Sequence, residues 1–143
     1  MCCMETGLTK EQLATYSPLV LAYLGDGTYE LFVRAMLVEK NNEPVQKLHK
    51  KATHYVKAAA QSRIMEVIEP LLTEEELAVF KRGRNAKSHT MPKNADMAEY
   101  RRATGFEALI GYLYLKQDTK RMTELMQLGV DTIEADYREM KES

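Results

Sequence analysis

Two carboxylate residues interrupt the most apolar stretches of the chain. Asp26 stands within residues 19–33, and Glu107 stands within residues 103–115. An ionised carboxylate removed from water costs several kcal/mol unless a cation or hydrogen-bond donors compensate for the lost hydration. Two such residues in separate apolar segments therefore favour a cation shared between them. Carboxylate oxygens of this kind are ligands that Mg²⁺ takes in proteins.

A lone acid in an apolar stretch does not by itself require a metal. It can occupy an exposed position, or it can pair with a cation such as Arg34 or Arg101. The neighbouring Gly25 and Gly27 favour a site or a close packing contact, because glycine inside a helix costs up to about 1 kcal/mol relative to alanine. Glu30, one helical turn further along, could support a metal, but a structural ion pair is the favoured interpretation.

The elements that position these residues are helices joined by short connectors. No stretch alternates apolar and polar residues between turn signals as a strand would, so the predicted fold class is all-α. Residues three, four and seven apart on a helix share a face, which places small residues and tyrosines around each acid. The predicted helices cover residues 9–15, 18–39, 44–68, 73–81 or a little beyond, and 94–116, with a last one that begins at 118 or 119.

Capping signals mark the starts of several of these helices. Ser17 and Pro18 form a typical N-cap and first-position pair. Thr73, three residues before Glu76, has the spacing of a capping box. Asn94 is the expected N-cap of the fifth helix.

The composition is that of a single soluble domain with segregated charges. The chain has 143 residues, of which 45% are hydrophobic and 29% charged, and we expect residues 1–8 to be frayed. It contains neither a secretory signal pattern nor an apolar run of membrane-spanning length, so the predicted location is the cytoplasm. The net charge is only −1, yet residues 47–63 and 81–102 are rich in lysine and arginine. This distribution permits a local basic surface that could bind phosphate groups.

Ordered motifs around both acids resemble those of a known enzyme family. The segments Leu21-Ala-Tyr-Leu-Gly-Asp26 and Gly27-Thr-Tyr-Glu-Leu31 resemble the signature helix of the ribonuclease III catalytic domain, and Glu107-Ala-Leu-Ile-Gly111 resembles its second acidic motif. Residues 82–88, 92–96 and 100–115 resemble the Mini-ribonuclease 3 subgroup of that family. The resemblance extends over roughly residues 13–115.

The resemblance implies a homodimeric, all-helical endonuclease that cuts double-stranded RNA with a divalent metal. It aligns Asp26 and Glu107 with the catalytic and metal-binding acids of the family, with Mg²⁺ as the metal and Mn²⁺ as a substitute. The products would carry 5′-phosphate and 3′-hydroxyl ends. The natural substrate would be precursor 23S ribosomal RNA, with a ribosomal protein as a candidate helper. The apolar helix with Leu21, Leu24 and Leu31 is the expected dimer interface.

The chain departs from the wider family pattern at three acidic positions. Leu19, Ala22 and Thr104 stand where the wider family has acids, so Asp26 and Glu107 are the acids of the pattern that remain. The number of metal ions at the site is therefore left open. No double-stranded-RNA-binding domain follows the catalytic pattern, so the catalytic domain itself is expected to bind the substrate.

An irregular loop is expected over residues 82–93, where Gly83 and Pro92 interrupt the helical pattern. Its side chains suit A-form RNA, which proteins recognise mainly through phosphates and 2′-hydroxyl groups. The candidate RNA contacts are Arg82, Arg84, Asn85, Lys87, His89 and Lys93. A solvated polar loop is the alternative. Residues 47–57 also form a basic helix face, for which solvent exposure is the simpler interpretation.

Two other classes of function stay open at this point. The first is a non-catalytic double-stranded-RNA-binding or ribosome-assembly factor on the same fold. The missing acids favour it, and the retention of Asp26 and Glu107 opposes it. The second is a helical protein-interaction module, which predicts neither RNA affinity nor metal dependence.

Overall fold

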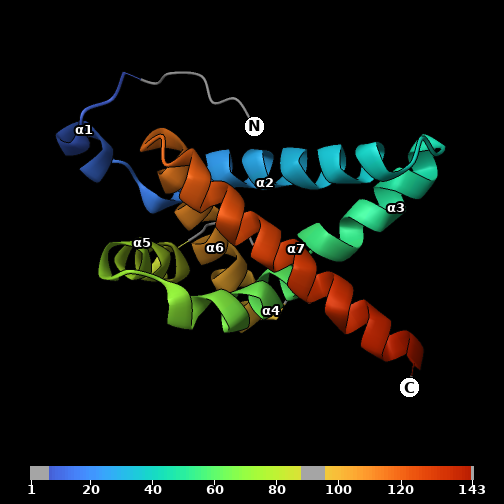
Figure 1. Cartoon of the computed structure of the whole chain (residues 1–143). Coiled ribbons are helices and arrows are strands. Elements are labelled where there is room, and N and C mark those ends of the chain that lie inside the picture. Colours follow the sequence, from blue (N-terminus) through green and yellow to red (C-terminus); the bar gives the residue numbers. More distant parts are fainter. Residues whose placement is uncertain (1–6, 88–95, 143) are drawn as a thin grey trace.

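A computed structural model describes residues 7–87 and 96–142 of the chain, and within them the fold is all-α, as predicted (Figure 1). The helices are α1 (Lys10–Ala14), α2 (Pro18–Lys40), α3 (Val45–Val56), α4 (Ala58–Ile68), the 3₁₀ turn η1 (Glu69–Leu71), α5 (Glu74–Asn85), α6 (Met97–Leu115) and α7 (Thr119–Glu142). None of these described helices is long and apolar enough to cross a membrane.

The capping signals of α2 and α5 are confirmed. The Ser17 hydroxyl accepts a hydrogen bond from the Leu19 amide, and Pro18 occupies the first turn of α2. Thr73 and Glu76 form a reciprocal capping box at the start of α5, with each side chain bonded to the other's backbone amide. These two helices therefore begin where the local sequence predicts.

The single helix expected over residues 44–68 is wrong, because the structure has two helices there. The backbone of Lys57 is extended, with ψ of 156°, and this separates α3 from α4. Two buried side chains bind the carbonyl groups that the break releases: the Tyr29 hydroxyl donates to the Tyr55 carbonyl at 3.0 Å, and the Gln61 amide donates to the Val56 carbonyl at 2.9 Å. Tertiary hydrogen bonds thus stabilise the break at Lys57, which no neighbouring glycine or proline indicates in the sequence.

The expected loop over residues 82–93 is also partly wrong. Helix α5 continues to Asn85, so its last turn includes Gly83. A Cβ atom at Gly83 would lie 2.7 Å from the Cβ of Ala108 and 3.0 Å from the Cα of Gly105, so this glycine serves helix packing instead of a turn. Helix α6 begins at Met97 with Asp96 as its N-cap, whereas the expected cap, Asn94, lies outside the described residues.

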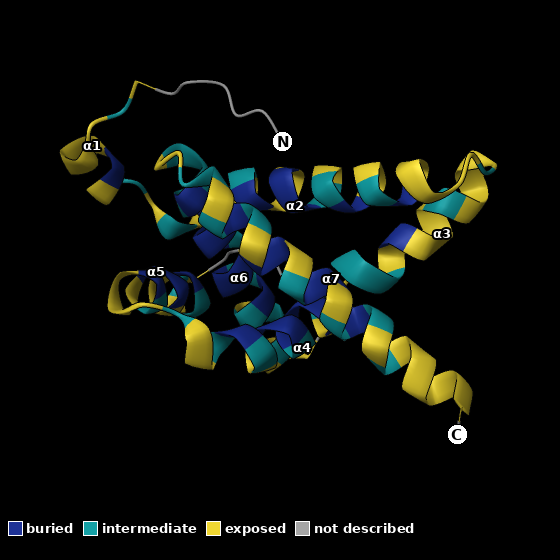
Figure 2. Ribbon diagram, viewed as in Figure 1, coloured by how far each residue is buried: buried dark blue, intermediate teal, exposed yellow. Residues whose placement is uncertain are grey.

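Helix α6 is the central element of the core. Its most extensive contact is with α2, and α4, α5 and α7 also pack on it. Figure 2 shows the buried residues gathered where these helices meet and exposed residues along the last turns of α7. The rings of Tyr29 and Phe106 lie edge to face with their centroids 5.1 Å apart, joining α2 to α6 at the core. The contact between α2 and α6 also positions the two acids.

Candidate active site

Glycines let α2 and α6 approach until their backbones touch. A Cβ atom on Gly25 would lie 1.7 Å from the Glu107 carbonyl oxygen, and one on Gly111 would lie 1.9 Å from the Leu21 carbonyl oxygen. No larger residue fits at either position without moving a helix. This crossing places the residue that follows Gly25, Asp26, beside Glu107, so the close approach creates the acidic site.

The two carboxylates lie close enough to act on one another. Asp26 is exposed, while Glu107 is partly buried. Burial raises the pKa of Glu107 to about 8, and the hydrogen bond and negative charge of Asp26 add to the effect. The charge of Glu30 also raises this pKa, whereas a hydrogen bond from Gln61 lowers it. Burial and the neighbouring acid therefore favour the protonated form of Glu107.

The cations that could have neutralised the pair do not do so. Arg34 forms an ion pair with Glu30 at 2.9 Å, which confirms the interpretation of Glu30 as an ion-pair partner. Arg101 is exposed and forms no ion pair with the described residues. Within residues 7–87 and 96–142, no lysine, arginine or histidine pairs with Asp26 or Glu107. Exposure to solvent therefore explains Asp26 but not Glu107. Pairing with a cation of the described residues explains neither acid.

Sequence reasoning missed one residue of the site, Gln61. Its side chain is only 2% exposed, and its Nε2 atom lies 3.4 Å from Oε2 of Glu107. The available signal was a polar residue after three alanines, Ala58 to Ala60, in a helix that packs on α6. Because the sequence predicts an unbroken helix from residue 44, nothing in the local pattern distinguishes this glutamine from other polar residues.

The positions where the wider family has acids supply no ligand. Leu19 is 36% exposed, Ala22 is buried, and the Thr104 hydroxyl donates to the Tyr100 carbonyl of its own helix. The part of the chain that the structure describes contains no group of three or more histidine, cysteine, aspartate or glutamate residues that could hold a metal. Two uncompensated carboxylates nevertheless fit Mg²⁺, which is commonly bound by one or two carboxylates and several waters.

The predicted RNA contacts begin on the last turn of α5. Arg82, Asn85 and Lys87 are exposed, and an Nη atom of Arg82 lies 3.4 Å from the Tyr16 carbonyl. Arg84 is partly buried, and its guanidinium lies 5.6 Å from the centroid of the Phe80 ring, so it covers the core. His89 and Lys93 lie outside the described residues. The turn packs on α6 through Gly83, at positions that flank Glu107 in the sequence.

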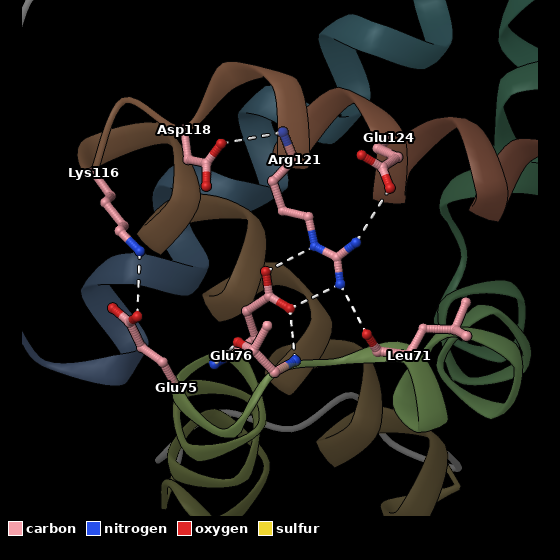
Figure 3. Close-up of polar contacts among 8 residues, drawn as sticks. Leu71, Glu75, Glu76, Lys116, Asp118, Arg121 and Glu124 are labelled. Atoms are coloured by element: carbon pink, nitrogen blue, oxygen red, sulfur yellow. Dashed lines mark hydrogen bonds and ion pairs between the residues drawn. The ribbon is translucent and has the colours of Figure 1, made fainter.

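A buried carboxylate on α5, that of Glu76, has a partner (Figure 3). Glu76 is 6% exposed, and its two oxygens accept hydrogen bonds from Arg121 of α7 at 2.8 and 2.9 Å. Arg121 also donates to the Leu71 carbonyl. Although burial opposes the change, the hydrogen bonds from Arg121 and Thr73 hold the pKa of Glu76 below its ordinary value. This acid is part of the structural framework and has no need of an external cation.

The exposed apolar residues of α2 differ from the interface residues predicted. Leu21 is fully buried in the protomer and Leu24 is partly buried, so of the three predicted residues only Leu31 is well exposed. The exposed apolar side chains of α2 are Leu19, Val20, Tyr23, Leu31 and Val38. Tyr23 is the most open of them, with 84% of its surface exposed.

Comparison with known proteins places this arrangement in a family. Residues 19–118 match the model of the ribonuclease III domain. The chain is 51% identical over 127 residues to Mini-ribonuclease 3 of Clostridium tetani, covering 88% of this chain and 84% of that one. It is 52% identical over 120 residues to Mini-ribonuclease 3 of Symbiobacterium thermophilum, covering 84% and 92%. A crystal structure of a Fusobacterium nucleatum protein superposes with a TM-score of 0.75 at 32% identity, over 82% of this chain and 93% of that one.

Proposed function

The chain belongs to the ribonuclease III family of endoribonucleases and is of the Mini-ribonuclease 3 type, and on that basis we propose that it hydrolyses double-stranded RNA at Asp26 and Glu107. The products carry 5′-phosphate and 3′-hydroxyl ends. The observation that carries this proposal is the pair of carboxylates brought together by the crossing of α2 and α6 without a cation from the described residues. Such a pair stabilises a divalent ion and is destabilised without one.

Mg²⁺, with Mn²⁺ as a substitute, is the ion that Asp26 and Glu107 hold in this proposal. When bound, it polarises the scissile phosphate, lowers the pKa of water and stabilises the leaving alkoxide. Glu107 must lose its proton to bind the ion, because its pKa is about 8 in the metal-free protein. The exposed Asp26 leaves the site open to a phosphate group from solvent.

The duplex is bound by the catalytic domain itself. The exposed Arg82, Asn85 and Lys87 contact phosphates or 2′-hydroxyl groups, together with His89 and Lys93 from the following segment. Arg84, whose guanidinium lies 5.6 Å from the centroid of the Phe80 ring, is the remaining contact of this set. Removal of one phosphate contact is expected to weaken binding of all duplexes about equally and to reduce its salt dependence.

Two active sites are needed to cut both strands, so the working unit is a twofold dimer. The apolar side chains exposed on α2, which include Val20, Tyr23 and Leu31, are the surface on which a second copy packs. The natural substrate is precursor 23S ribosomal RNA in the cytoplasm, and a ribosomal protein is a candidate helper. These assignments rest on the family resemblance, and each can be tested separately from the chemistry.

The proposal is tested with purified protein, a long RNA duplex and Mg²⁺, beside the variants Asp26→Asn and Glu107→Gln. Glu39→Gln is the matched control, because Glu39 is an exposed acid on α2 without an ion pair among the described residues. Cleavage is expected for the wild type and Glu39→Gln, and it should stop in both site variants and in EDTA. Duplex binding without cleavage in every sample would contradict the proposal and favour a non-catalytic RNA-binding factor.

A further inference from the structure

We propose that Gln61 is a positioning residue of the active site, which orients Glu107 and offers its own oxygen to a water of the metal that Asp26 and Glu107 hold. The inference rests on the proposed function and deepens it. Gln61 lies in the first turn of α4, directly after the break at Lys57. It comes from an element that neither acid occupies, so it adds a third helix to the site.

The amide of Gln61 has one tenable orientation. Its Nε2 atom donates to the Val56 carbonyl at 2.9 Å and lies 3.4 Å from Oε2 of Glu107. A backbone carbonyl can only accept, so rotating the amide would place its oxygen against another acceptor. The break between α3 and α4 therefore fixes the amide, and the fixed amide constrains the carboxylate of Glu107.

This orientation leaves the amide oxygen without a partner. Oε1 of Gln61 is buried and accepts no hydrogen bond from the described residues, and the residue as a whole is only 2% exposed. A buried acceptor of this kind costs about 1–3 kcal/mol if it stays unpaired. The free acceptor belongs to the same planar amide as Nε2, the atom that contacts Glu107.

A hydrated metal ion supplies the missing donor. Mg²⁺ keeps several waters when proteins bind it through one or two carboxylates, and each of these waters donates hydrogen bonds. Oxygen acceptors in the outer shell orient such ligands, and their loss typically lowers metal affinity by about 10–100-fold. Gln61 thus provides an acceptor in a site where Leu19, Ala22 and Thr104 supply no carboxylate.

The test separates this role from simple support of the helix break. Gln61→Met removes both polar atoms at similar volume. Tyr29→Phe is the matched control, because the Tyr29 hydroxyl binds the neighbouring Tyr55 carbonyl at the same break. Both variants are expected to lower the midpoint of thermal unfolding. Only Gln61→Met should weaken Mg²⁺ binding, by at least about tenfold in titration calorimetry with MgCl₂ alone.

A second variant keeps the proposal falsifiable if Gln61→Met does not fold. Gln61→Glu retains an oxygen acceptor but loses the donor to the Val56 carbonyl, so it should bind Mg²⁺ more tightly than Gln61→Met. Wild-type affinity in Gln61→Met, or equal weakening in Tyr29→Phe or Gln61→Glu, would overturn the positioning role while the proposed function stands. Failure of the wild type both to bind Mg²⁺ and to cleave duplex RNA would remove the proposed function and this inference with it.

Discussion

Two carboxylates with low exposure, Glu76 and Glu107, show how differently one fold can treat the same chemical group. Glu76 receives two hydrogen bonds from Arg121, and despite its burial its pKa lies below the ordinary value. Glu107 has another acid, Asp26, as its neighbour, and burial together with that acid raises its pKa to about 8. Both acids lose hydration, but only one has a cation within the described residues.

The difference distinguishes a structural acid from an acid that awaits a ligand. The Glu76 pair closes the contact between α5 and α7 and is complete in the protein alone. The Glu107 site is assembled by an equally specific contact, the touching backbones at Gly25 and Gly111, yet it places two acids together without a cation from the described residues. A partly buried acid without a compensating cation persists when function requires it, because stability alone would select against it.

The largest effect is expected from separating the helices that create the uncompensated site. In Gly25→Ala the added methyl group would lie 1.7 Å from the Glu107 carbonyl oxygen, so α2 and α6 must move apart. We expect a loss of at least about 4 kcal/mol in the free energy of unfolding, measured with denaturant. Gly27→Ala is the control, because its methyl group meets no atom within 4 Å, and it should raise stability by up to about 1 kcal/mol, since alanine is favoured over glycine inside a helix. Similar stability of the two variants would refute the close crossing.

The next effect comes from removing the cation of the compensated acid. Arg121→Met leaves Glu76 buried without its partner, and we expect the free energy of unfolding to fall by about 3 kcal/mol. Arg138→Met is the matched control, since Arg138 is exposed and forms no ion pair with the described residues; its change should stay within about 0.5 kcal/mol. A loss below about 1 kcal/mol for Arg121→Met would mean that this pair does not compensate for the burial.

Neutralising the uncompensated acid, in Glu107→Gln, is expected to raise the free energy of unfolding at high pH instead of lowering it. The folded-state pKa of Glu107, about 8, exceeds its ordinary value, so its contribution to stability is fully present below about pH 4.5 and is lost as the pH rises through 8. In metal-free buffer the wild type should therefore lose about 3 kcal/mol more than Glu107→Gln between pH 5 and pH 8. Denaturant unfolding of both proteins at the two pH values measures this. Parallel curves would contradict the raised pKa.

The smallest effect concerns metal affinity and pH. Mg²⁺ competes with the proton on Glu107, so binding should strengthen as the pH rises through 8. Between pH 7 and pH 9 the affinity should rise about tenfold, and each ion bound at pH 7 should release close to one proton. Calorimetry in two buffers of different ionisation enthalpy measures both quantities. An affinity that does not change with pH would indicate that Glu107 is not a ligand.

Local signals predicted most of the fold and both acids. The starts of α2 and α5 follow from Ser17-Pro18 and from the Thr73 capping box, because these caps depend on neighbouring residues alone. The apolar setting of Asp26 and Glu107 identified them without structural knowledge. These features are local in sequence, so the sequence reveals them directly.

The errors concern contacts between distant segments. The break at Lys57 depends on hydrogen bonds from Tyr29 and Gln61, which lie outside any local pattern. Gly83 suggested a turn, but its lack of a side chain instead lets α5 pack closely against Ala108 of α6. Whether an acid has a cation is likewise decided by tertiary structure, as the comparison of Glu76 with Glu107 shows.

The most direct test of an uncompensated carboxylate pair that binds a divalent ion is a crystal of the protein soaked in Mn²⁺. Anomalous scattering locates this ion independently of its ligands. We expect one peak between the carboxylates of Asp26 and Glu107, at coordination distance from an oxygen of each, and no such peak in Glu107→Gln. An absent peak at this position, or a lysine or arginine side chain that occupies it, would contradict a metal site formed by these two acids.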